Sequence, residues 1–183
     1  TEPENVTISG EYIHFPGENL TLNVSGDNIA QDATYTWKKG GQVIAGQITA
    51  TLTINSCEIT DAGNYTCTVS NGNGCEATAD YTIKMYRLRG LTDDINNWTT
   101  DFVFTKVNAT TATYSMELAA NSSYQFKVHD GSDYYGNIGG NPTMTSGNCT
   151  NWEMRQNTGN NVTLQTTAAG TYTFTLDYTD ASN

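Results

Sequence analysis

The stretch that decides the fold of the first half reads Asp61-Ala62-Gly63-Asn64-Tyr65-Thr66-Cys67-Thr68-Val69. Its apolar side chains recur at every second residue, which is the spacing of a strand with one face in a core. Asp and Gly stand ahead of the alternating part, and both are typical turn residues. The stretch therefore predicts a half-buried β-strand that the chain enters from a tight turn.

The segments before this stretch follow the same two-residue period. Apolar residues alternate with polar ones in three further places: Leu20, Leu22 and Val24; Tyr35 and Trp37; Leu52 and Ile54. Turns such as Pro16-Gly17 and Gly40-Gly41 separate these runs. Because no segment shows the 3.6-residue spacing of a helical face, we expect an all-β protein.

The residues Asp61, Gly63, Tyr65 and Cys67 resemble the Asp-x-Gly-x-Tyr-x-Cys signature of the immunoglobulin superfamily. Trp37 matches the buried Trp of that family. The resemblance implies an immunoglobulin-like β-sandwich over residues 1–86, in which Tyr65 forms the tyrosine corner. Val24 stands where the family places the first Cys of its inter-sheet disulfide, so we expect Cys67 to be a free buried thiol packed against Val24 and Trp37.

The second half of the chain, residues 87–183, predicts another β-sandwich. Alternating apolar sets recur along it: Phe102 and Phe104; Tyr114, Met116 and Leu118; Tyr124, Phe126 and Val128; Tyr172, Phe174, Leu176 and Tyr178. Such sets supply the inward faces of two packed sheets. The fold class is thus all-β, with two tandem β-sandwiches of which the first is immunoglobulin-like.

Three aromatic residues of the second half lie in segments that do not alternate. Trp98 follows the run Asp94-Ile95-Asn96-Asn97, and Tyr134 and Tyr135 follow the turn 129–133. A large ring in a polar loop is costly to solvate unless it packs or receives a ligand, so these rings are candidate binding platforms. Sugars suit them, because a pyranose stacks on a ring while nearby amides and carboxylates bond its hydroxyls.

The order of segments in this half resembles the starch-binding β-sandwich modules of amylases and pullulanases and of Bacteroidetes starch-utilisation surface lipoproteins. The matching parts are Leu88-Arg89-Gly90 with Asn97-Trp98, the run 124–131, Asp133-Tyr134-Tyr135-Gly136, and the closing run 169–177. The resemblance implies non-catalytic binding of an α-glucan. It gives Trp98 and Tyr135 as stacking rings, Tyr134 as a second choice, and Lys127, Asp133 and Asn137 as polar contacts.

Each of these residues also has a purely structural interpretation. Trp98 could cap the open end of the sandwich, and Lys127 could be a solvated strand residue. Asp93, Asp94, Asp130 and Asp133 could together bind Ca²⁺, but no twelve-residue helix-loop-helix motif is present, and we predict no metal site and no cofactor. His14 and His129 lack a nucleophile at motif spacing, so we predict no catalytic residue and no enzyme activity.

The charge balance limits the partners. The 183 residues carry 19 Asp and Glu against 8 Lys and Arg, a formal net charge of −11. Nucleic acid would repel such a chain, and no apolar run approaches the roughly 20 residues that a membrane helix needs. A neutral glucan is the ligand class most compatible with this charge, because net charge neither attracts nor repels it.

The expected partner is therefore a polysaccharide or oligosaccharide, together with neighbouring domains of a larger protein. The chain opens Thr1-Glu2-Pro3-Glu4 without signal-peptide features, so we expect a processed product or a fragment of an extracellular or cell-surface protein. Its resemblances suggest a bacterial surface protein or an accessory region of a secreted enzyme. The alternative is an adhesive or structural spacer protein that recognises protein partners.

Overall fold

The computed structural model describes residues 1–91, 98–137, 143–145, 154–156 and 160–179. The chain divides into two compact units, Thr1–Met85 and Tyr86–Ser182. In the described part of the chain, strands make up both units, and the single helical element is a 3₁₀ turn, η1 (Ile59–Asp61). The protein is all-β, as its alternating sequence predicts.

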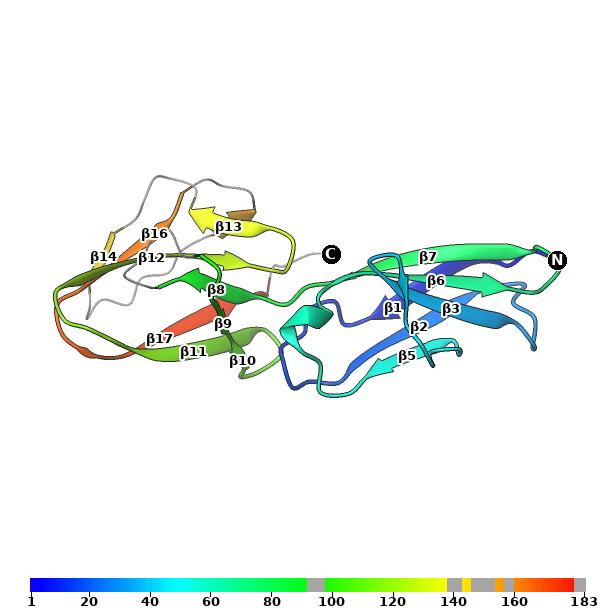
Figure 1. The fold of residues 1–183 in the computed structure, drawn as a ribbon, viewed down its shortest axis with the longest axis horizontal. Helices are drawn as coiled ribbons and strands as arrows, with labels where there is room; N and C mark the ends of the chain where they lie inside the picture. Colours follow the sequence, from blue (N-terminus) through cyan, green and yellow to red (C-terminus); the bar gives the residue numbers. More distant parts are fainter. Residues whose placement is uncertain (92–97, 138–142, 146–153, 157–159, 180–183) are drawn as a thin grey trace. The chain divides into compact units, whose positions relative to one another are not determined.

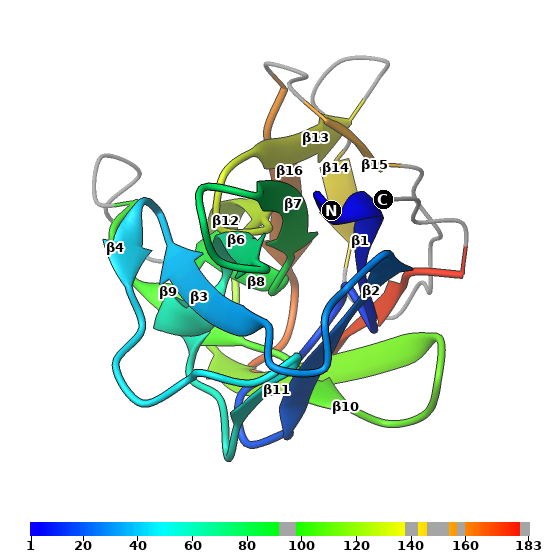
Figure 2. The same ribbon diagram turned by 90° about the vertical axis from the view of Figure 1, so that its right-hand side faces the viewer.

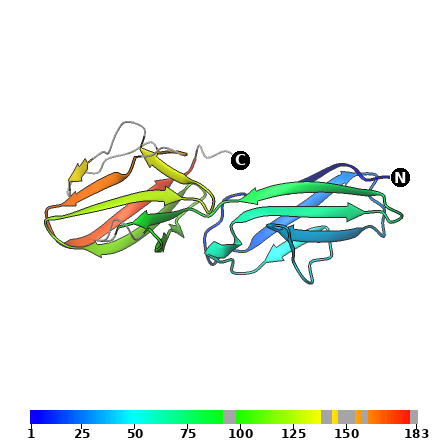
Figure 3. The same ribbon diagram turned by 45° about the horizontal axis from the view of Figure 1, so that its top comes forward.

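The first unit has two sheets. One holds three antiparallel strands in the order β1 (Glu4–Gly10), β2 (Leu20–Asp27) and β5 (Thr51–Ile54). The other has the order β4 (Gln42–Val43), β3 (Thr34–Lys39), β6 (Gly63–Ser70) and β7 (Glu76–Ile83). Figure 3 shows the long strands β6 and β7 side by side over the blue strands of the other sheet.

The core of the first unit forms around Trp37, Tyr65 and Cys67, which are all fully buried. The Trp37 indole donates a hydrogen bond to the Thr49 carbonyl (2.9 Å), and the Tyr65 hydroxyl donates one to the Asp61 carbonyl (2.8 Å). The second bond is the tyrosine corner, so this prediction is confirmed. Asp61 thereby ties the turn before β6 to the strand itself.

Cys67 is a free thiol in the same core cluster as Trp37, with the half-buried Val24 packed against it. Burial raises the pKa of Cys67 to about 11. The thiol therefore stays protonated at neutral pH and behaves as a small apolar group. The prediction of a missing inter-sheet disulfide at Cys67 is confirmed; Cys149 lies outside the described residues.

The second unit also has two sheets, which form separate layers in Figures 1 and 2. The smaller has the order β10 (Thr105–Lys106), β11 (Thr111–Leu118) and β17 (Gly170–Asp177). The larger has the order β14 (Thr143–Thr145), β16 (Val162–Thr166), β12 (Ser122–His129), β13 (Tyr134–Asn137) and β15 (Met154–Gln156). In addition, β8 (Arg87–Gly90) pairs with β12, and β9 (Asp101–Val103) pairs with β8.

Strand β12 has one face in the core and one face outside. Tyr124, Phe126 and Val128 are buried, and the Phe126 ring meets the Phe174 ring of β17 edge to face at 5.3 Å. This contact joins the two sheets of the second unit. Since successive strand residues point to opposite faces, Gln125, Lys127 and His129 share the outer face.

One edge of β12 has a notch at Lys127. Phe126 pairs with both β8 and β16, and Val128 pairs with both β8 and β13, so β16 and β13 share the edge opposite β8. The pairing with β16 ends at Phe126 and the pairing with β13 starts at Val128. Lys127 therefore lies where one neighbouring strand stops and the next begins.

Gly90 brings β8 close to β12 beside this notch. Its φ of +102° is a conformation that L side chains rarely adopt, and a Cβ there would lie 2.2 Å from the Gln125 carbonyl oxygen. The following Leu91 donates its N–H to that same carbonyl at 2.8 Å. Only glycine allows this approach.

Candidate functional site

A pocket of about 330 Å³ opens at the notch in β12. Its described lining consists of Trp98, Lys127, Tyr134 and Asn161. Tyr134 is the first residue of β13, Asn161 immediately precedes β16, and Lys127 lies between them on β12. Trp98 comes from the segment that connects β8 to β9, so four separate parts of the chain meet here.

Tyr134 is held by cationic and aromatic neighbours. Arg89 Nη1 donates a hydrogen bond to the Tyr134 hydroxyl at 2.9 Å. The guanidinium carbon of Arg89 and Nζ of Lys127 each lie 5.9 Å from the centroid of the Tyr134 ring, within cation–π range. The His129 ring meets the same ring edge to face at 4.4 Å. The position of Tyr134 is thus fixed from several sides.

Arg89 is itself oriented by Asp101 of β9. The Asp101 carboxylate pairs with Nε of Arg89 and also with Nε of Arg87, the latter at 3.1 Å. Burial alone would raise the pKa of Asp101, but the hydrogen bond from Arg89 and the charges of both arginines hold this pKa below its ordinary value. One carboxylate therefore pairs with two guanidinium groups.

His129 adds no charge to this cluster at neutral pH. Burial, and then the positive charges of Arg87 and Arg89, lower the pKa of His129 below its ordinary value near 6.5. Its Nδ1 accepts a hydrogen bond from the Gly131 N–H at 3.0 Å, which places the ring proton on Nε2. His129 thus supports the Tyr134 ring as a neutral imidazole.

Tyr135 does not line the pocket. It follows Tyr134 on β13 and points to the opposite face, where its ring packs against Tyr86 with centroids 5.6 Å apart. Its hydroxyl donates to Asp130 Oδ2 at 2.7 Å. Burial, followed by this hydrogen bond, raises the pKa of Tyr135 above its ordinary value. Of the two adjacent tyrosines, the second choice from the sequence is the one at the pocket.

Asp130 organises the turn between β12 and β13. Its Oδ1 accepts the N–H groups of Ser132 (2.9 Å) and Asp133 (2.8 Å), while its own N–H donates to the Asp133 carbonyl at 3.1 Å. Asp133 is thus part of the turn and is not among the pocket's described lining residues. This turn fixes where β13 starts, and therefore where Tyr134 lies.

Two other assignments made from the sequence are the polar contact Asn137 and the possible Ca²⁺ site that includes Asp93 and Asp94. Asn137 ends β13, and its backbone pairs with Met154 of β15, away from the start of the strand where Tyr134 lies. Asp93 and Asp94 lie outside the described residues. Within the described ranges, the structure places no group of three or more His, Cys, Asp or Glu side chains where they could hold a metal ion.

Sequence reasoning missed two residues of this site, Asn161 and Arg89. Asn161 Nδ2 donates to Gln125 Oε1 at 3.1 Å, across 36 positions of the sequence. Such a neighbour follows from strand register, which the alternation of apolar residues does not specify. For Arg89, the signal was its alternation with Leu88, which places the guanidinium on the outer face.

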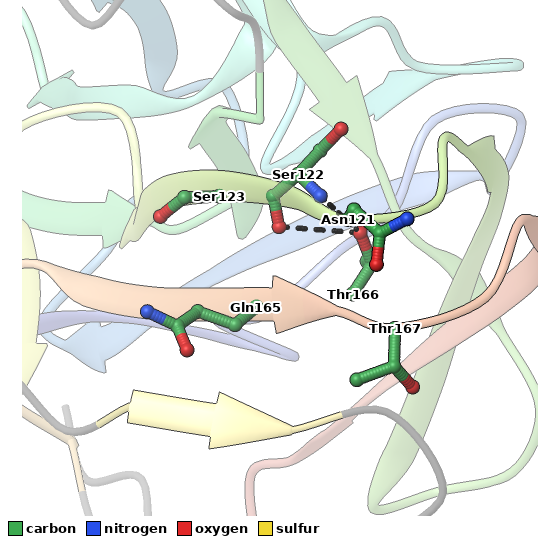
Figure 4. Close-up of a pocket in the computed structure, with 6 residues that line it drawn as sticks. All are labelled: Asn121, Ser122, Ser123, Gln165, Thr166 and Thr167. Atoms are coloured by element: carbon green, nitrogen blue, oxygen red, sulfur yellow. Dashed lines mark hydrogen bonds between the residues drawn. The ribbon is translucent and has the colours of Figure 1, made fainter.

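A second pocket, of about 310 Å³, lies where β12 and β16 pair near Ser122 (Figure 4). Its lining is made of hydroxyl and amide residues: Asn121, Ser122, Ser123, Gln165, Thr166 and Thr167. The Thr166 hydroxyl accepts from the Ser122 N–H at 3.1 Å and donates to the Ala119 carbonyl. This pocket offers neither a ring nor a charge among these residues, so the first pocket is the stronger candidate site.

Residues 2–71 match the family model described as "Immunoglobulin domain". The match ends before the second unit begins. No curated protein matches the chain. In the described residues, no helix is both long and apolar enough to cross a membrane.

Two solved structures also match the chain. The three N-terminal domains of the highly immunogenic outer capsid protein (Hoc) of bacteriophage RB49 are 13% identical with a TM-score of 0.42; the alignment covers 92% of this chain and 71% of that one. Sidekick-1 immunoglobulin domains 1–5 are also 13% identical with a TM-score of 0.34, covering 92% of this chain and 37% of that one. Taken with the tyrosine corner, the buried Trp37 and the two packed sheets, the family match identifies the first unit as an immunoglobulin-like domain.

Proposed function

We propose that this protein is a non-catalytic binding module that holds a saccharide in the pocket lined by Trp98, Lys127, Tyr134 and Asn161. The observation that carries the proposal is the convergence of two aromatic rings, an ammonium group and an amide at one notch in the sheet. Rings and convergent polar groups are what a pyranose needs, since its C–H face packs on a ring and its hydroxyls take hydrogen bonds.

The size of the pocket limits the ligand and the affinity. Its volume of about 330 Å³ is near the lower end of the roughly 300–1,000 Å³ typical of ligand sites. We therefore expect a short stretch of a polymer to occupy it, with an affinity in the roughly micromolar to millimolar range. Weak sites of this kind serve to keep a larger assembly close to its polymer, here at a cell surface or beside a secreted enzyme.

The polar chemistry of the pocket favours binding over catalysis. Glycoside hydrolysis generally uses two carboxyl groups about 5–9.5 Å apart. The charged group among the described lining residues is the ammonium of Lys127 instead. The α-glucan implied by the resemblance to starch-binding modules is one member of the saccharide class that this pocket could take.

Affinity gel electrophoresis on amylopectin, pullulan and xylan tests the proposal. We expect retardation on at least one polymer and its loss in Trp98→Ala and Tyr134→Ala. Gln165→Ala, in the second pocket, is the matched control and should keep the mobility shift of the native chain. Binding that survives both pocket substitutions would overturn the assignment of the site.

A second candidate function is adhesion to a protein, and an exposed apolar pair in the first unit favours it. Val43, on the edge strand β4, is 63% exposed, and Ile48, in the segment that follows, is 72% exposed. An edge strand with exposed apolar side chains is a ready surface for another chain. Sedimentation velocity would detect self-association through this edge, and Val43→Lys should abolish it if the edge is used.

A further inference from the structure

We infer that the saccharide bound at this pocket carries an anionic group, a carboxylate or a sulfate, and that Lys127 binds that group. The inference rests on the proposed saccharide function and names the ligand class more narrowly. It departs from the neutral glucan that the net charge of −11 favours, because a binding site responds to its local charges first.

The ammonium group of Lys127 lines the pocket, and among the described residues it pairs with no carboxylate. Each of the two outer-face arginines nearby pairs with Asp101, whereas no ion pair involves Lys127 among the residues that the structure describes. No Asp or Glu occurs in the described lining either. A half-buried ammonium that lines a pocket without a partner is best satisfied by a negatively charged ligand.

The charged groups next to the Tyr134 ring also favour an anionic ligand. Arg87 and Arg89 both pair with the carboxylate of Asp101, and His129 is neutral at pH 7 because its pKa is lowered. The carboxylate of Asp130 accepts from two backbone N–H groups and from the Tyr135 hydroxyl, and its negative charge also acts on Arg87 and His129. With Lys127, the two arginines therefore outnumber the carboxylates of Asp101 and Asp130 by one.

The hydrogen-bonding groups of the pocket also favour an acceptor-rich ligand. Because the Tyr134 hydroxyl accepts a bond from Arg89, its own proton is available to donate. Lys127 has donors only. Asn161 donates one N–H to Gln125, and its amide oxygen can accept a hydrogen bond from a sugar hydroxyl. Donors therefore outnumber the acceptor, which suits an anionic group next to a ring hydroxyl on the same sugar.

Polymers with the same backbone and different charge test the inference by affinity electrophoresis at low and at 0.15 M salt. The probes are polygalacturonate and its fully methyl-esterified form for carboxylate, and dextran sulfate and dextran for sulfate. We expect a charged polymer to bind at least about tenfold more tightly than its neutral counterpart. The carboxylate and sulfate pairs, run side by side, show which anionic group is preferred.

Lys127→Met removes the charge and keeps much of the side-chain volume. We expect it to remove most of the preference for the charged polymer, whereas Lys127→Arg should retain it. Lys38→Met, in the first unit, changes net charge by the same amount and should leave binding unaltered. Circular dichroism of each variant confirms that the fold is kept.

The possible failures are distinguishable. If a neutral polymer binds through Tyr134 and its charged counterpart binds no better, the inference about charge is overturned and the saccharide function stands. If Lys127→Met leaves the preference intact, the role of Lys127 is overturned. If no polymer, charged or neutral, is retarded, the proposed function itself fails.

Discussion

Arg89 donates a hydrogen bond from Nη1 to the Tyr134 hydroxyl at 2.9 Å, across 45 positions of the sequence. This bond couples β8, which carries Arg89, to β13, which carries Tyr134. The two strands pair with opposite edges of β12. The guanidinium thus reaches over the outer face of β12, on the side where Lys127 lies. Asp101 orients Arg89, and Arg89 positions the aromatic wall of the pocket.

The Asp101 carboxylate should make the stability of the second unit depend on acid pH. Its pKa is lowered in the folded protein, so its contribution is fully present above the ordinary Asp pKa of about 4 and is lost as pH falls below it. Urea unfolding of the native chain and of Asp101→Asn, compared between about pH 2 and pH 7, measures the effect. The difference in unfolding free energy between the two proteins should shrink as pH falls; a constant difference would contradict the ion-pair account.

Tyr65→Phe should destabilise the first unit by about 1–2 kcal/mol, because it removes the hydroxyl bonded to the Asp61 carbonyl inside the turn before β6. Tyr81→Phe is the matched control. It removes a hydroxyl bonded to the Gly10 carbonyl at 2.6 Å, but this bond is exposed, so water can replace it. Equal losses in the two variants, measured by urea unfolding, would argue against a special role of the tyrosine corner.

Val24→Cys should restore the inter-sheet disulfide that this immunoglobulin-like domain lacks. Val24 packs against the cluster that contains Cys67, and a bridge between the two strands would stabilise the domain by about 2–4 kcal/mol. Thermal unfolding with and without reductant measures the gain, and thiol titration reports whether the bridge forms. Two titratable thiols at these positions under oxidising conditions would show that the side chains at 24 and 67 do not face each other closely enough to form a disulfide.

Gly90→Ala should destabilise the second unit by more than about 2 kcal/mol, because the added Cβ would collide with the Gln125 carbonyl and also stand at positive φ. Gly17→Ala, in the first unit, provides the comparison. Its φ of +93° is similar, but nothing lies within 4 Å of the added Cβ. Hydrogen exchange resolved along the chain, compared between the two variants, separates backbone strain from collision; equal effects would remove the role of close packing at Gly90.

The sequence predicts the first unit well because its decisive contacts are local or marked by one residue type. The tyrosine corner spans four residues, from Tyr65 back to Asp61, so the motif and the bond coincide. Trp37 and Cys67 are direct cross-strand partners, and their burial follows from the same alternation. Only the 3₁₀ turn at η1 departs from the purely extended expectation.

The candidate site is harder to predict because it depends on register. Tyr134 and Tyr135 are equivalent by composition, and the turn organised by Asp130 decides which of them meets the outer face. Asn161 reaches the pocket only because β16 pairs antiparallel with β12 and stops at Phe126. The alternating pattern gives the two faces of each strand but not where a neighbouring strand stops, so the notch at Lys127 could not be inferred.

A map of ligand-induced amide shifts by ¹⁵N–¹H NMR on the whole chain tests the saccharide site residue by residue. Saccharide fragments matching the retained polymer are titrated into the native protein. We expect the largest shifts on Trp98, Lys127, Tyr134 and Asn161, and their loss in Tyr134→Ala, while the residues of the first unit stay unchanged. Shifts confined to the first unit, or to the second pocket around Gln165, would contradict this expectation.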